Sequence, residues 1–438
     1  MSTTNARQPG PFHSRLAEPY VATAEPDGRD RKKALPDNRS NWLRNPRGDS
    51  ILPISKLESV WPMDGPSLGD QLRLSARQLL TVAGESWLNW LLVFVPVSII
   101  VDVLALPDLW LFISSAIAIV PLAGLIGEAT EQLADRVGPG IGGLLNASFG
   151  NATELIIATF ALSAGLPEVV KASISGSIIS NLLLVLGLSM LVGGWGRERQ
   201  LFNRTSAGAN SAMLFLSAIA LIMPAVFDLA LFGSLERTSP AIEQLSFLVA
   251  LVLLGTYLAS LVFSLRTHRK LFISVAHEPE EPVLSLPTAL FLLLAATVAA
   301  AFEAEVLVGA ISGASAALGM TEFFVGVIVV AVVGNAAEHF SAVIVALKDK
   351  MDLAVNIATG SATQIALFVA PVLVLLSSLM GRPLSLVFNA FEIGAVVVSV
   401  LILAIVSLDG ESNWFEGLQL VAVYVVLAIV FYFVPGGL

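Results

Sequence analysis

Two glutamates, Glu154 and Glu338, each lie inside a long apolar stretch, within the motifs Gly-Asn-Ala-Thr-Glu and Gly-Asn-Ala-Ala-Glu. In both copies a Gly-Ser pair begins 22 residues after the glutamate, at Gly176 and at Gly360. This repeated spacing indicates an internal duplication. An ionised carboxylate is costly to bury in an apolar span, so both glutamates are candidate functional residues whose charge a bound cation or a proton would relieve.

The chemistry that suits such a pair is binding of a hard divalent cation. Ca²⁺ takes six to eight oxygen ligands, and two carboxylates would neutralise its charge. We therefore expect Glu154 and Glu338 to hold Ca²⁺. Asn151 and Asn335 lie three residues earlier on the same helical face and are expected to bind the cation or to cap a broken helix, which Gly150 and Gly334 would ease. The alternative is that these glutamates and asparagines only form hydrogen bonds between helices.

A second polar set follows the motifs at matching positions. Ser177 and Ser180 align with Ser361 and Gln364, and Asn181 aligns with an apolar residue in the second copy. We expect these polar residues, Asn181 included, to line the ion site or its hydrated access path, and the four aligned ones are also candidates for a proton relay. Packing of small residues would explain the serines almost as well. The exchange of Ser180 for Gln364 makes the site only pseudo-symmetric.

Three titratable residues outside these sets are further candidates for ion entry or a proton relay. His339 directly follows Glu338, and an imidazole can titrate near neutrality. Glu128 and Glu303 are predicted near the ends of the second and seventh apolar spans. Ordinary solvated helix ends, and a hydrogen-bonded histidine, are the alternative readings.

The composition indicates an all-α polytopic membrane protein in contact with the lipid bilayer. Of the 438 residues, 55% are hydrophobic, mean hydropathy is +0.81, and apolar stretches of about 18 residues or more recur. The chain contains no cysteine, which excludes disulfides and thiolate metal sites. No HExxH motif and no cysteine nucleophile is present, and we expect no enzyme, no cofactor and no nucleic-acid partner. The oligomeric state is not indicated.

Eleven transmembrane helices are predicted: one peripheral helix and two inverted five-helix repeats. The motif copies fall in spans three and eight, and an odd separation of five spans makes them cross the membrane in opposite directions. Glu154 and Gly176 are each 11 residues from Gly165, and Asp349 has the same midpoint role in the second copy, which places both carboxylates about 16 Å from a turn and near mid-membrane. The predicted organisation is a disordered cytosolic tail (1–80), a first helix (87–106), the first repeat (109–265), a cytosolic linker with a short acidic patch (266–283) and the second repeat (284–438).

The distribution of basic residues predicts the orientation. Twelve of the 24 Lys and Arg lie in the first 80 residues, and the remaining loops on that side carry nine against three on the other. The positive-inside rule therefore puts the N-terminus in the cytosol, and eleven spans put the C-terminus on the opposite side.

The two extended motifs, residues 150–158 with the following Ser-Gly-Ser stretch and residues 334–371, closely resemble the paired signature repeats of the cation/proton exchanger family, within the calcium/cation antiporter superfamily. The resemblance covers nearly all of the chain after residue 85. It implies an eleven-helix fold and export of cytosolic Ca²⁺ in exchange for protons. It also implies that Glu154 and Glu338 are the ion-binding glutamates, that Asn151 and Asn335 are the motif asparagines, and that His339 is the histidine after the second motif.

Charge balance suggests how the two fluxes are coupled. Two neighbouring carboxylates in a low dielectric are stabilised either by protons or by Ca²⁺, so competition for one pair supports alternating access with Ca²⁺ and protons as substrates. Sodium coupling, Mn²⁺ as substrate, or a passive cation channel stay open as alternatives. The membrane is expected to be a bacterial plasma membrane or a eukaryotic vacuolar membrane.

Overall fold

The computed structural model describes residues 42–44, 50–53, 75, 78, 84, 86–137, 139–233, 239–267 and 283–435. The chain divides into two compact units, Met1–Gly65 and Pro66–Leu438. In the first unit, β1 (Trp42–Arg44) pairs antiparallel with β2 (Ser50–Pro53), a strand pair that the sequence did not predict. The tail was predicted to be disordered over 1–80. Apart from the two strands and residues 75 and 78, which are helical, the residues of this tail lie outside the described part of the chain, and so does the acidic patch of the linker.

The described part of the second unit is mainly helical. Its segments are largely apolar, and an apolar segment in a membrane must satisfy its own backbone hydrogen bonds, as an α-helix does. Seven of its described helices are long and apolar enough to cross a membrane, and a bent pair, Glu322–Gly334 with Ala336–Leu347, makes eight if it is counted as one span. Three shorter apolar helices, Trp87–Val103, Ala152–Ser163 and Ala390–Val406, fall below that length. The protein is therefore a multi-pass membrane protein, and helix length alone does not reach the predicted count of eleven.

The helices of the first half follow the predicted apolar stretches in chain order. They are η1 (Trp87–Val93), α3 (Phe94–Val103), α4 (Asp108–Val137), α5 (Pro139–Phe149), α6 (Ala152–Ser163), α7 (Pro167–Ile179), η2 (Ser180–Val185), α8 (Leu186–Gly193), α9 (Arg204–Phe232), α10 (Pro240–Val262) and η3 (Phe263–Thr267).

The second half repeats this order of long, broken and long helices. Its elements are α12 (Leu286–Leu318), α13 (Glu322–Phe324), η4 (Val325–Val330), α14 (Ala331–Gly334), α15 (Ala336–Leu347), α16 (Met351–Gln364), η5 (Ile365–Val369), α17 (Ala370–Leu379), α18 (Ala390–Val406) and α19 (Trp414–Tyr432). Two short strands, β3 (Gln200–Leu201) and β4 (Glu411–Ser412), pair antiparallel between the halves.

Two predicted helix boundaries are wrong, and the error moves a candidate residue. Glu303 was predicted near the end of the seventh span, but α12 continues to Leu318, so Glu303 lies in the middle of a helix. Glu128 was likewise predicted near the end of the second span, but α4 continues to Val137. Hydropathy falls where polar residues enter a helix, whereas the helix itself continues because its backbone hydrogen bonds do not depend on side-chain polarity.

The turns that the duplication predicted are present. Gly165 has φ of +77° between α6 and α7, and Asp349 has φ of +62° between α15 and α16. A glycine accepts this left-handed conformation readily, and an aspartate tolerates it better than most residues. Each motif is therefore carried on a helix–turn–helix pair that folds back on itself.

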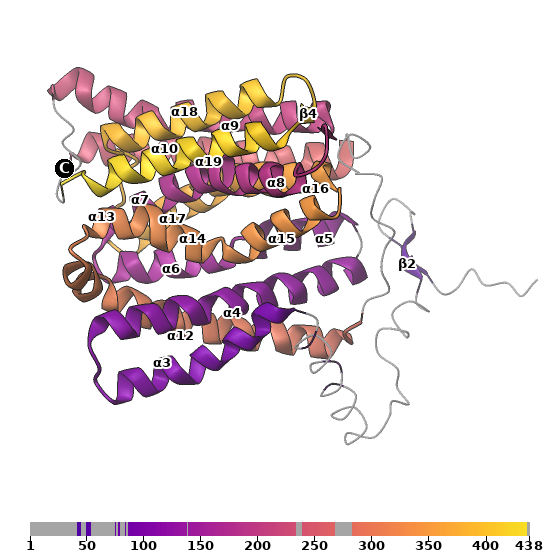
Figure 1. Cartoon of the computed structure of the whole chain (residues 1–438), viewed down its shortest axis with the longest axis horizontal. Coiled ribbons are helices and arrows are strands. Elements are labelled where there is room, and N and C mark those ends of the chain that lie inside the picture. Colours follow the sequence, from indigo (N-terminus) through magenta and orange to yellow (C-terminus); the bar gives the residue numbers. More distant parts are fainter. Residues whose placement is uncertain are drawn as a thin grey trace, which may run out of the picture. The chain divides into compact units, whose positions relative to one another are not determined.

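The broken helices lie inside the second unit. Figure 1 shows α3, α4 and α12 on one side, α9, α18 and α19 on the other, and α6, α14 and α15 between them. The long helices α4 and α12 pack against each other, and α12 also contacts α6. Ser75 and Gln78, which belong to the predicted tail, hydrogen bond to Thr288 and Ser285 at the start of α12. The motifs are thus enclosed by helices from both halves.

Candidate functional site

Both motifs interrupt a helix at their asparagine. Asn151 separates α5 from α6 with φ of −105° and ψ of 26°, and Asn335 separates α14 from α15 with φ of −93° and ψ of 9°. The second break bends the span by 58°. Neither asparagine side chain caps the following helix, so the capping part of the prediction is wrong, although the predicted break is confirmed.

The breaks place the two glutamates in the first turns of α6 and α15. The N-terminus of a helix carries a partial positive charge, which stabilises a nearby carboxylate by about 0.3–1 kcal/mol, and by more when it is partly buried. Broken helices thus supply a favourable field to the buried carboxylate oxygens of Glu154 and Glu338. The two carboxylates are close enough for their charges to interact.

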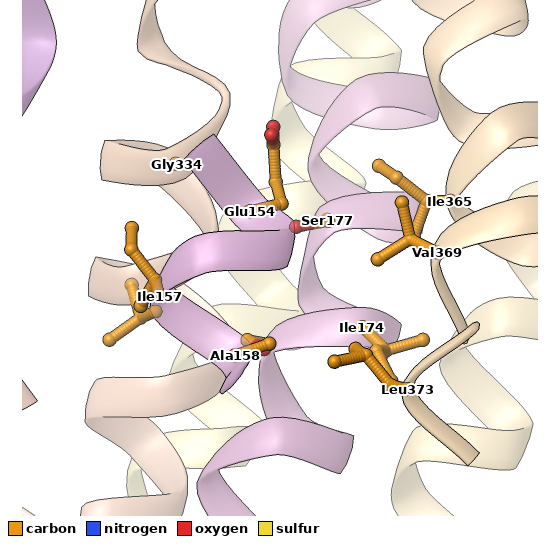
Figure 2. Close-up of a pocket in the computed structure, with 11 residues that line it drawn as sticks. Glu154, Ile157, Ala158, Ile174, Ser177, Gly334, Ile365, Val369 and Leu373 are labelled. Atoms are coloured by element: carbon orange, nitrogen blue, oxygen red, sulfur yellow. The ribbon is translucent and has the colours of Figure 1, made fainter. Parts of the chain in front are cut away.

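The motifs also contact each other directly. A methyl group at Gly334 would lie 3.3 Å from the Cγ atom of Glu154, so the missing side chain makes room for the glutamate of the other half. Figure 2 shows Glu154 extending from α6 beside Gly334 and Ser177, with Ala158, Ile174 and Leu373 toward the other end of the pocket.

A small cavity opens beside Glu154. Its volume is about 10 Å³, and apart from Glu154, Ser173 and Ser177 its lining is apolar or glycine. That volume accommodates about one water molecule. A cation beside Glu154 in this conformation would therefore have to replace its water ligands by protein oxygens.

The amide of Asn335 is held on both sides by hydrogen bonds. Its Nδ2 donates to the Ser177 hydroxyl and to the Ala331 carbonyl, both at 2.8 Å. Its Oδ1 accepts from Nδ2 of Asn181 at 3.1 Å and lies 3.4 Å from the hydroxyl of Ser361. This network joins α7, η2, the second helix break and α16, and it is buried throughout.

Asn151 forms a simpler contact with the other half. Its Nδ2 donates to Oε1 of Gln364, the last residue of α16, and its side chain is fully buried. The structure therefore joins the two halves through predicted residues at two places. Asn151 bonds to Gln364 at one place, and Asn335 bonds to Ser177 and contacts Ser361 at the other. Ser361 also hydrogen bonds to the carboxylate of Glu338.

Buried oxygen atoms gather around these contacts. Within the described part of the chain, no hydrogen-bond partner reaches five of them: Oδ1 of Asn151, both carboxylate oxygens of Glu154, Oδ1 of Asn181 and Oε2 of Glu338. An unpaired buried acceptor costs about 1–3 kcal/mol. All five are oxygen atoms with free lone pairs. A hard cation requires such ligands, and an anion would be repelled by them.

Other predicted residues lie outside this network. The Ser180 hydroxyl donates to the Ser177 carbonyl of its own helix, and Glu128 accepts from Gln132 within α4. Glu303 is fully buried in α12 and accepts from Ser98 of α3 at 2.6 Å. His339 is in the first half of α15, and its buried Nε2 has no partner among the described residues.

Two features of the site were not predicted as such. Asn181 was expected to line the ion site or its access path, but its hydrogen bonds to Asn335 and Ser361 of the other half were not predicted. The π-helical segments η2 and η5 begin at Ser180 and directly after Gln364, at equivalent places in the two halves. Such segments occur frequently at functional sites, but they leave no simple sequence signal.

Comparison with known families agrees with this arrangement. The family model described as "Sodium/calcium exchanger protein" matches residues 108–266 and 288–433, which is more than half of the chain and includes both motifs. The chain belongs to the sodium/calcium exchanger family. The match is interrupted between residues 266 and 288, where the sequence places the linker between the two halves.

Relatives and solved structures of the family extend the likeness. A Ca²⁺/H⁺ antiporter of Aphanothece halophytica is 46% identical over 360 residues, which are 79% of this chain and 96% of the relative. A vacuolar calcium ion transporter of Schizosaccharomyces pombe is 39% identical over 387 residues, 84% of this chain and 93% of the relative. The structure of native YfkE is similar with a TM-score of 0.68 and 42% identity, covering 78% of this chain and 98% of that one.

Proposed function

We propose that this exchanger exports Ca²⁺ from the cytosol in exchange for protons, and that Glu154 and Glu338 bind the ion. The observation that carries the proposal is the set of five buried oxygens without a hydrogen-bond partner among the described residues, which come from both halves. Two carboxylates balance the charge of Ca²⁺, and amide oxygens, backbone carbonyls and at most about one water complete its coordination in this conformation. The Ca²⁺/H⁺ antiporters among its relatives support the choice of both substrates.

Coupling follows from competition for the carboxylate pair. Two ionised carboxylates that interact in a low dielectric repel each other, and either protons or one divalent cation removes the repulsion. Binding of Ca²⁺ therefore displaces protons, and arrival of protons displaces Ca²⁺. Exchange requires only that the occupied states cross the membrane more readily than the empty, doubly charged one.

Alternating access is supported by the way the halves meet. Each half contributes one broken helix and one helix with a π-helical segment, and the hydrogen bonds at the centre run between halves. Eleven spans with inverted five-helix repeats, an N-terminus in the cytosol and a C-terminus on the far side would place the two halves around a common midplane site. Rocking of one half against the other then exposes the site to each side in turn.

The remaining polar residues serve as the route to this site. Ser177, which lines the cavity beside Glu154, is the candidate for the ion's path on that side. Glu303 and His339 carry buried titratable groups away from the central network and are candidates for the proton route. Glu128, on α4, is the candidate for ion entry.

The test is Ca²⁺ uptake into proteoliposomes with an imposed pH gradient. We expect uptake that depends on internal acid and collapses with a protonophore in the full-length protein, and no such uptake in Glu154→Gln or Glu338→Gln. Glu322→Gln, which changes a half-buried carboxylate at the start of α13 that accepts from Ser312, is the matched control and is expected to transport normally.

Three results would contradict the proposal in different ways. Uptake that ignores the pH gradient but follows a Na⁺ gradient would replace the proton by sodium as coupling ion. Uptake that needs neither gradient would indicate a channel. Gradient-driven uptake that survives both glutamine substitutions would place the ion site elsewhere.

A further inference from the structure

The two halves of the site, although duplicated in sequence, use their motif asparagines differently. Both ends of the Asn335 amide are hydrogen bonded: Nδ2 donates to Ser177 and Ala331, and Oδ1 accepts from Asn181. In Asn151 only Nδ2 is hydrogen bonded, and the buried Oδ1 has no partner among the described residues. The same residue type in the same motif thus presents a free oxygen in one half and none in the other.

The cause of this difference lies at one aligned position. Ser180 in the first half corresponds to Gln364 in the second. The Ser180 side chain is short and bonds back to its own helix, whereas Gln364 is long enough to reach Asn151 across the interface between halves. The amide oxygen of Gln364 accepts a hydrogen bond from Asn151 and so holds the NH₂ group of Asn151 toward Gln364. The carbonyl oxygen of Asn151 is then left without a partner among the described residues.

That direction matters for a cation. An amide oxygen is a Ca²⁺ ligand, while the hydrogens of an amide NH₂ group carry partial positive charge and have no lone pair to offer the ion. Groups that orient a ligand through a hydrogen bond control metal affinity, and their loss typically costs about 10–100-fold in binding. Gln364 occupies this orienting place for Asn151, directly before the π-helical segment η5.

We propose that Gln364 is a positioning residue that orients the carbonyl oxygen of Asn151 as a Ca²⁺ ligand. Asn335, in contrast, holds the two halves together through its hydrogen bonds and is not a ligand. The inference rests on the proposed function of the site as a Ca²⁺ site. Its neutral oxygens then come from the first half, from Asn151 and Asn181, and the second half contributes Glu338.

The experiment is equilibrium binding of Ca²⁺ to the purified full-length chain at alkaline pH, together with thermal unfolding. Gln364→Leu, which keeps the size but removes the acceptor, is expected to weaken Ca²⁺ binding about 10-fold with little change in melting temperature. Ser180→Ala, at the aligned position of the other half, is the matched control and is expected to change binding less than 2-fold.

A double-mutant cycle separates positioning from a general structural role. If Gln364 acts through Asn151, the variant with both Asn151→Ala and Gln364→Leu binds Ca²⁺ no more weakly than Asn151→Ala alone. Asn335→Ala is expected to lower the melting temperature, because it leaves the Asn181 and Ser177 groups without their partner. Additive losses in the cycle, or equal effects of Gln364→Leu and Ser180→Ala, would overturn the inference.

The failure of this inference differs from failure of the proposed function. Normal binding by Gln364→Leu in a protein whose binding still requires Glu154 and Glu338 would remove only the positioning role. Binding that is unchanged in Glu154→Gln and Glu338→Gln would remove the site itself, and both proposals with it.

Discussion

Gly176 and Gly360 occupy the same place in the two halves, and adding a methyl group to each tests whether the halves pack alike. At Gly176 a Cβ atom would overlap the backbone carbonyl oxygen of Val327 and lie 2.7 Å from its carbon, so α7 and η4 are in backbone contact there. At Gly360 no atom lies within 4 Å of the added Cβ. Sequence alone treats the two glycines as equivalent.

The magnitude follows from the matched pair. Alanine gains about 1 kcal/mol over glycine within a helix, and this gain is common to both positions. Overpacking costs about 1–3 kcal/mol, and the upper end applies at Gly176 because a backbone neighbour cannot rotate away as a side chain can. We expect Gly360→Ala to be stabilised by about 1 kcal/mol and Gly176→Ala to be destabilised by about 2 kcal/mol.

The assay is thermal unfolding of the purified protein in detergent, followed by tryptophan fluorescence. A difference of about 3 kcal/mol between the variants should separate their melting temperatures by roughly 5 °C, with Gly176→Ala the lower. Equal melting temperatures, or a lower value for Gly360→Ala, would refute the close approach of α7 and η4. Ca²⁺ uptake by Gly360→Ala should stay near that of the unchanged protein.

Two further predictions concern charge. Because protons and Ca²⁺ compete for the carboxylate pair, the apparent Ca²⁺ affinity should fall as pH falls, by about 10-fold per pH unit for each proton displaced. Glu154→Gln removes one of the two titrating groups and should make this pH dependence shallower. Binding that does not depend on pH would contradict the competition. Lys171 is buried and donates to the Val387 carbonyl, while its ion-pair partner Glu168 is 45% exposed. Lys171→Met should therefore cost about 2 kcal/mol of unfolding free energy, mainly because it removes the donor to the buried Val387 carbonyl, whereas Lys348→Met at an exposed position should cost almost nothing. Equal effects of the two substitutions in denaturation would show that the contact with Val387 is dispensable.

The candidate site was predicted largely from spacing. The duplicated motifs, the turns at Gly165 and Asp349, and the helix breaks at Asn151 and Asn335 follow from local rules: apolar periodicity, residues that tolerate positive φ, and glycine beside the break. Helix ends were predicted less well. The end of α12 was missed because the hydropathy decreases before the helix ends, and Glu303 was therefore placed near a helix end.

What the sequence by itself determined is therefore the membrane class, the duplication and the pair of glutamates, because these depend on composition and on order along the chain. Only the tertiary structure decided which partners meet, since the hydrogen bonds from Asn151 to Gln364 and from Asn335 to Ser177 join residues that are 213 and 158 positions apart. It also decided that the halves differ. Two identical motif asparagines form different hydrogen bonds, because the side chains that reach them from the other half differ, and the local sequence does not encode those contacts.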